Sequence, residues 1–126
     1  MNSLTILFCS LAILAHLGFF ILESVRWGQP AVNRMFQVSS DQAEANRLFA
    51  FNQGFYNLFL AVGLAIGLFL KSVGAHPAAG QTLIVFTCCS MLAAAIVLVI
   101  SAPRAIWGAL LQGLPPLTAL ITIGVL

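Results

Sequence analysis

Four long apolar stretches that contain no charged residue constrain this chain more than any other feature. Each has 19 to 23 residues, and a helix needs about 20 apolar residues to cross the hydrocarbon core of a membrane. Because no water is present there to pair backbone groups, each stretch must be a helix. We therefore predict an all-α integral membrane protein, a four-helix up-down bundle that forms one domain, with spans at residues 4–22, 48–70, 82–102 and 105–126.

Composition supports this class and excludes several others. Charged residues make up 6 % of the 126-residue chain and hydrophobic residues 61 %, whereas a soluble domain has roughly 25 % charged residues. A soluble enzyme needs a larger share of charged residues than this on its water-facing surface. The net charge of +2 comes from scattered basic residues, which argues against nucleic acid as a partner. The three cysteines form no C-x-x-C pair or Cys/His zinc pattern, so neither a disulfide scaffold nor a metal site is expected.

The few charges predict the orientation in the membrane. Residues 23–47, between the first two spans, hold six of the eight charged residues. The first and third connections together hold four Lys and Arg residues and the second holds only Lys71, and positively charged loops stay in the cytoplasm. We therefore expect a protein of the plasma or inner membrane with both termini outside. Ser39, Ser40 and Asp41 form a helix-start signal, so we expect the second helix to begin near Gln42.

Polar residues on the first helix mark one face. At 100° per residue His16, Glu23 and Trp27 lie within about 40° of one another. Small or aromatic residues continue the same face toward both ends, namely Thr5, Cys9, Ala12 and Phe20. Because ionisable residues at membrane depth are costly, His16 and Glu23 are the candidate catalytic residues.

Two further helices carry polar residues to a similar depth. The second has Asn52, Gln53, Tyr56 and Asn57, followed by Gly63 and Gly67 in a GxxxG pattern that lets a neighbouring backbone approach. The fourth has Gln112, and the prolines that follow it free backbone carbonyl groups inside the helix. Measured from the charged side, the deepest of these side chains lie roughly 12–15 Å into the membrane. This convergence predicts one polar pocket, whose candidate substrate-binding residues are Trp27, Asn52, Gln53, Tyr56, Asn57 and Gln112.

Each of these residues also has a structural interpretation that the sequence leaves open. Asn, Gln and Tyr side chains can join membrane helices by hydrogen bonds, worth about 0.6 kcal/mol each. Trp27 is also typical of a residue at the membrane interface. Glu23 can form a surface ion pair with Arg26.

The same residues resemble a known family. His16, Glu23 and Trp27 in their spacing, the block Asn52-Gln53-Gly54-Phe55-Tyr56-Asn57, and Gln112-Gly113-Leu114-Pro115 resemble the small bacterial membrane-protein family catalogued as domain of unknown function 1304. The resemblance covers essentially the whole chain and implies a four-helix integral membrane protein without a settled activity. Members of the family often carry a Glu directly before the His, where this chain has Ala15.

Three functions fit these residues. In the first, the pocket binds a lipophilic small molecule taken from the membrane lipids, and His16 and Glu23 act on it as acid and base in an isomerisation or hydrolysis. In the second, the protein is a proton-coupled small-molecule transporter that resembles the small multidrug exporters. In the third, it is a non-catalytic subunit of a membrane assembly, with a homo-oligomer as one form. We expect no cofactor, and a haem bound through His16 alone stays open as an alternative.

Overall fold

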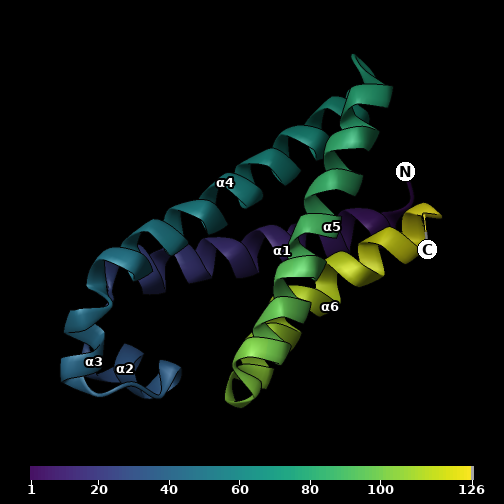
Figure 1. The fold of residues 1–126 in the computed structure, drawn as a ribbon. Helices are drawn as coiled ribbons and strands as arrows, with labels where there is room; N and C mark the ends of the chain where they lie inside the picture. The colour runs from purple at the N-terminus through teal and green to yellow at the C-terminus, as the bar shows by residue number, and fades with distance from the viewer. Residues whose placement is uncertain (126) are drawn as a thin grey trace.

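The computed structural model describes residues 1–125. Four long helices dominate it (Figure 1): α1 (Ser3–Phe20), which continues without a break as the π-helical segment η1 (Ile21–Val25), α4 (Arg47–Ser72), α5 (Pro77–Ser101) and α6 (Ile106–Ile123). The short elements are α2 (Pro30–Phe36), α3 (Ser40–Ala45) and the 3₁₀ turn η2 (Pro103–Ala105). Each long helix, with η1 or η2 included, is long and apolar enough to cross a membrane. This confirms the predicted all-α class.

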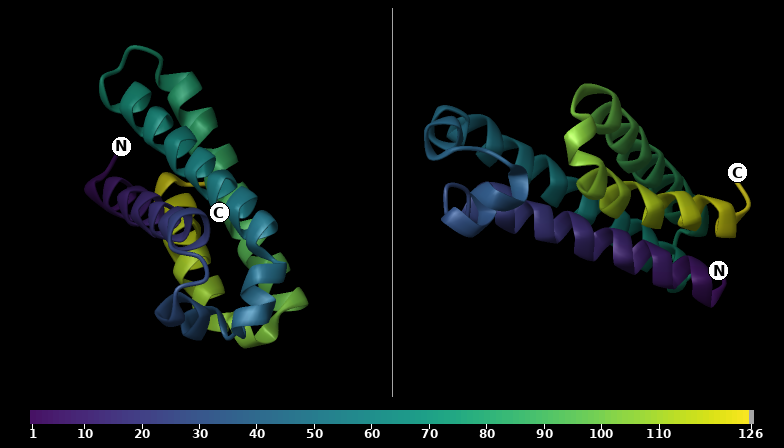
Figure 2. Two further views of the ribbon diagram at one scale, coloured as in Figure 1. Left: turned by 90° about the vertical axis from the view of Figure 1, so that its left-hand side faces the viewer. Right: turned by 90° about the horizontal axis from the view of Figure 1, so that it is seen from below.

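The long helices form a ring in which each packs against two others. Helix α1 contacts α4 and α6, and α5 contacts the same two helices from the other side. Successive helices run in alternating directions, so both termini lie at one end, opposite α2 and α3 (Figures 1 and 2). At the terminal end Asn2 donates from Nδ2 to the Thr122 carbonyl oxygen at 3.1 Å, and Thr5 Oγ1 lies 3.0 Å from Thr122 Oγ1. These bonds join α1 to α6.

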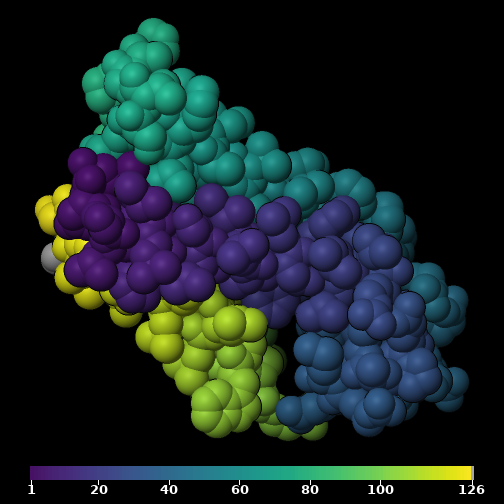
Figure 3. All heavy atoms as spheres, turned by 180° about the vertical axis from the view of Figure 1, so that it is seen from behind, coloured from purple at the N-terminus to yellow at the C-terminus, as the bar shows by residue number. Residues whose placement is uncertain are grey.

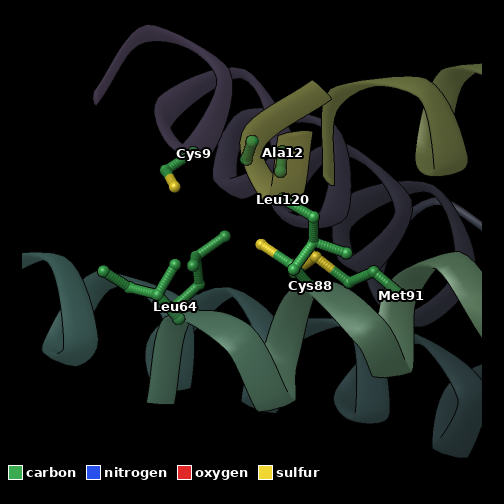
Figure 4. Close-up of a cluster of buried hydrophobic side chains, with 8 residues drawn as sticks. Cys9, Ala12, Leu64, Cys88, Met91 and Leu120 are labelled. Carbon is green, nitrogen blue, oxygen red and sulfur yellow. The ribbon is translucent and has the colours of Figure 1, made fainter. Parts of the chain in front are cut away.

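Aliphatic and sulfur-containing side chains fill the centre of the ring. Figure 4 shows that the labelled side chains come from all four long helices and gather in one cluster. The buried cluster consists of Cys9, Ala12, Leu64, Ile84, Cys88, Met91, Ala119 and Leu120. On α1 the buried residues are Thr5, Cys9, Ala12 and His16, so the face that the sequence marked is the one that packs inward.

The second glycine of the GxxxG pattern, Gly67, lies where α4 crosses α5, whereas Gly63 makes only an ordinary contact. A Cβ atom on Gly67 would lie 3.1 Å from the carbonyl oxygen of Gly80, and one on Gly80 would lie 2.8 Å from the carbonyl oxygen of Gly67. Backbone thus meets backbone at this crossing, as small residues permit between membrane helices. The pattern therefore serves a contact within the chain.

Two boundaries differ from the prediction. Helix α5 begins at Pro77, one turn before the apolar stretch starts, because proline suits the first position of a helix. The predicted start near Gln42 is wrong for the second long helix. Ser39 does form a capping box with Gln42, but it opens the separate helix α3, which ends at Ala45 and has Asn46 as its C-cap. Asn46 donates from Nδ2 to the carbonyl oxygen of Gln42, a local bond that competes with helix continuation, and α4 begins one residue later.

Candidate functional site

A large cleft separates the α1/α4 pair from the α5/α6 pair at the end that carries α2 and α3. Its volume is about 1090 Å³. Figure 3 shows a hollow between the turn that joins α5 to α6 and the segment that contains α2 and α3. At the mouth Gln37 donates from Nε2 to the carbonyl oxygen of Arg104 at 3.5 Å. Five of the six predicted binding residues line the cleft together with Glu23: Trp27, Gln53, Tyr56, Asn57 and Gln112.

The π-helical segment places Glu23 in this cleft. The backbone N–H of Arg26 bonds the carbonyl oxygen of Ile21, five residues earlier, at 2.9 Å. Such a segment holds more residues in each turn than an α-helix, and π-segments are frequent at functional sites. Glu23 is its middle residue. Nothing in the apolar pattern distinguished this segment from the α-helix before it, so the sequence did not predict it.

A close approach between η1 and α4 holds this segment in place. Ser24 donates from Oγ to the carbonyl oxygen of Phe51 at 2.7 Å. Gly54 lies directly opposite, and a Cβ atom there would be 2.9 Å from the backbone nitrogen of Ser24. The glycine in the Asn-Gln-Gly block is therefore required by packing, because any side chain would push η1 away from α4.

Glu23 is hydrogen-bonded across the helices. Asn57 donates from Nδ2 to Glu23 Oε2 at 2.8 Å, and the same amide lies 3.2 Å from the carbonyl oxygen of Gln53. The expected alternative, a surface ion pair between Glu23 and Arg26, is wrong. Arg26 donates from Nε to Gln29 instead, and the ion pair found within residues 1–125 joins Arg47 to Glu44. Within residues 1–125 Glu23 thus has an amide partner and no cationic partner, and it lines the cleft.

Trp27 connects the end of η1 to α3. Its indole Nε1 donates to the carbonyl oxygen of Ala43 at 2.7 Å. Its ring meets that of Phe36 edge to face, with centroids 5.1 Å apart. Trp27 therefore lines the cleft and also attaches α3 to the segment that follows η1.

We expect the substitution Trp27→Phe to loosen α3 while leaving the long helices intact. Phenylalanine keeps an aromatic ring against Phe36 but lacks the N–H donor, and a lost hydrogen bond of this kind costs about 1 kcal/mol. Hydrogen–deuterium exchange should become roughly fivefold faster in α3 and stay unchanged in α5. Trp107→Phe is the matched control, because Trp107 is 79 % exposed. Equal exchange in both variants would show that the indole bond does not hold α3.

His16 and Asn52, also predicted for the site, lie elsewhere. His16 is 1 % exposed inside the bundle and is not part of the cleft lining. Its Nδ1 lies 2.9 Å from the carbonyl oxygen of Ala12, which can only accept, so Nδ1 carries the proton in this hydrogen bond. Asn52 is exposed and donates to the carbonyl oxygen of Leu48 in its own helix. Among residues 1–125 no three His, Cys, Asp or Glu side chains come together to hold a metal ion.

Comparison with known proteins identifies the family of this chain. The family described as "Protein of unknown function (DUF1304)" matches residues 10–123. The chain belongs to this family. No curated protein and no solved structure matches the chain. The family description assigns no activity, so the function of this DUF1304 protein has to be inferred from its cleft.

Proposed function

We propose that this membrane protein binds a lipophilic small molecule in the cleft between its two helix pairs, and that Glu23 exchanges a proton with it in an isomerisation or hydrolysis. The observation that carries the proposal is the position of Glu23. It lines a cavity of about 1090 Å³ and accepts its protein hydrogen bond from the neutral amide of Asn57. Ligand sites are typically apolar cavities of roughly 300–1,000 Å³ with a few converging polar groups.

The surrounding side chains support acid–base chemistry at one carboxyl group. Asn57 occupies Oε2 and orients the carboxyl group, which leaves Oε1 to take a proton from the bound molecule or return one. The amides of Gln53 and Gln112 line the same cleft and can donate to charge that develops on the molecule. His16 has no direct part in this proposal, because its ring does not line the cleft.

The proposed orientation gives the molecule two routes of entry. Positively charged connections favour the cytoplasmic side for α2, α3 and η2. The cleft mouth, bridged by Gln37 and Arg104, then faces the cytoplasm, and the cleft lies within the cytoplasmic half of the membrane. A lipophilic molecule can enter from the lipid and keep its polar end near the aqueous surface.

Isotope transfer from solvent tests the proposal. Purified protein is incubated with lipophilic extracts in water enriched in deuterium and heavy oxygen, and the products are analysed by mass spectrometry. We expect an isomerisation to place deuterium on carbon, or a hydrolysis to place heavy oxygen in the product. Glu23→Gln, which keeps the shape but loses the base, should lower the rate by about 100-fold or more.

Glu44→Gln is the matched control, since Glu44 is an exposed acid of α3 outside the cleft lining and should leave the rate unchanged. Equal isotope transfer by the wild-type protein and by Glu23→Gln would contradict the role of Glu23. Absence of transfer from every extract would contradict the enzymatic proposal.

The second candidate is a proton-coupled transporter, and one observation favours it. Because His16 does not line the cleft, Glu23 is left as the cleft's acidic group, and one carboxyl group is sufficient to exchange a proton for a bound molecule. Substrate-driven proton flux in proteoliposomes that Glu23→Gln abolishes, without any isotope transfer, would favour transport over catalysis.

A further inference from the structure

We propose that the molecule bound in the cleft is a lipophilic cation, an apolar body with a protonated amine that pairs with Glu23. This inference rests on the proposed function, because it requires that the cleft binds a ligand. It goes further by naming the charge of that ligand and the residue that recognises it.

The unmatched charge of Glu23 is the first reason. Glu23 is the acidic residue of the cleft lining, while the nearest acids in sequence, Asp41 and Glu44, belong to α3 and do not line it. Within residues 1–125 Glu23 forms no ion pair, and its hydrogen-bond donor is a neutral amide. A carboxylate that lines a largely apolar cleft without a cationic partner gains most from a ligand that supplies the positive charge.

The aromatic lining is the second reason. Aromatic residues from α1, α2, α4, α6 and the connection after η1 line the cleft: Phe19, Trp27, Phe36, Phe49, Tyr56 and Trp107. The faces of aromatic rings attract ammonium groups, by about 2 kcal/mol or more where the cation is desolvated. The same rings offer apolar surface to the body of the ligand. A carboxylate with several rings is a typical combination for recognising a lipophilic ammonium ion.

Arg104 decides which end of the cleft takes the charge. Arg104 is one of the residues that line the cleft, and its backbone carbonyl oxygen accepts a hydrogen bond from Gln37 at the mouth. It precedes Gln112 by eight residues, which is roughly 12 Å along a helix. A positive group at the mouth would be repelled by Arg104, whereas at the depth of Glu23 it meets the opposite charge. An anionic amphiphile would instead be drawn toward Arg104, so the charge of the head group separates the two arrangements.

Three probes with the same apolar chain test the inference: decylammonium, decanol and decanoate. The chain has two tryptophans, and both line the cleft, but Trp107 is 79 % exposed. All measurements therefore use a Trp107→Phe background in nanodiscs, in which the emission of Trp27 reports occupancy of the cleft. For each probe the half-saturating concentration is given as the amount of probe per lipid in the bilayer. This removes the differences in how the three probes distribute between water and lipid. We expect decylammonium to saturate at a concentration at least about tenfold lower than decanol, since a desolvated ion pair exceeds a neutral hydrogen bond by this much or more.

Two variants assign the preference to one carboxyl group. Glu23→Gln should raise the half-saturating concentration of decylammonium to that of decanol, and Glu44→Gln should leave it unchanged. Equal saturation by decanol and decylammonium, or a preference for decanoate, would overturn the cation assignment and leave the binding cleft standing. Lack of saturable change with all three probes would overturn the binding cleft as well.

Discussion

Replacing Gly54 with alanine should push η1 away from α4 and break the hydrogen bond between Glu23 and Asn57. The new Cβ atom would lie 2.9 Å from the backbone nitrogen of Ser24 and closer still to its hydroxyl group, which is held by the Phe51 carbonyl oxygen. Overpacking of this kind costs about 1–3 kcal/mol. Alanine gains about 1 kcal/mol of helix propensity over glycine, so the clash exceeds the gain.

Thermal unfolding in detergent measures the first effect, and decylammonium binding measures the second. We expect Gly54→Ala to unfold several degrees earlier than wild type and to lose the preference for the ammonium probe. Gly63→Ala is the matched control on the same helix, because its Cβ atom would lie 3.5 Å from Thr87 Oγ1, an ordinary contact. It should unfold at the wild-type temperature or above it. If Gly54→Ala is as stable as Gly63→Ala, the close approach of η1 to α4 is not required.

Replacing Gly80 with alanine should separate α4 from α5 and destabilise the whole bundle. Its Cβ atom would lie 2.6 Å from the backbone nitrogen of Lys71 and 2.8 Å from the carbonyl oxygen of Gly67. Both are backbone atoms, which cannot rotate away as a side chain can, so the helices must move apart. We expect the free energy of unfolding to fall by about 1–3 kcal/mol. The separated helices would also lose van der Waals contacts, which stabilise packing between membrane helices.

The expected result is a lower unfolding temperature for Gly80→Ala than for Gly108→Ala. Gly108 lies in α6, and no atom comes within 4 Å of a Cβ atom placed there, so that control tests the gain in helix propensity alone. Because Gly80 is far from the cleft lining, Gly80→Ala should also keep the preference for decylammonium once it is folded. Equal unfolding temperatures for the two variants would show that α4 and α5 adjust without cost.

The membrane helices and part of the candidate site were predictable from local chemistry. Long apolar runs must be helical in a membrane whatever surrounds them, and each of the four predicted stretches coincides with one long helix, although the last predicted residue, 126, lies outside the described residues. The Ser39 cap was also predicted, since a side-chain oxygen at a helix start acts within a few residues. The pairing of Glu23 with Asn57 confirms that polar groups of the first two long helices meet.

The misplacement of His16 relative to Glu23 comes from the assumption of regular α-helical geometry. At 100° per residue His16 and Glu23 belong to one face, but η1 changes the winding after Phe20. His16 then packs inside the bundle while Glu23 lines the cleft. Asn52 was assigned to the site because it shares a broad helical arc with Gln53, Tyr56 and Asn57, yet its side chain bonds its own helix and is exposed.

The sequence by itself determined that this chain forms four membrane-spanning helices with its polar residues concentrated toward one end. Burial of apolar surface and the pairing of backbone groups depend on composition along each segment, so no knowledge of the other helices was needed. Only the tertiary structure decided which polar residues share a cavity. That choice depends on the π-helical turn at Glu23, on the close contact of Gly54 with Ser24, and on the separation of the two helix pairs. Each of these arises from contacts between segments that lie far apart in the chain.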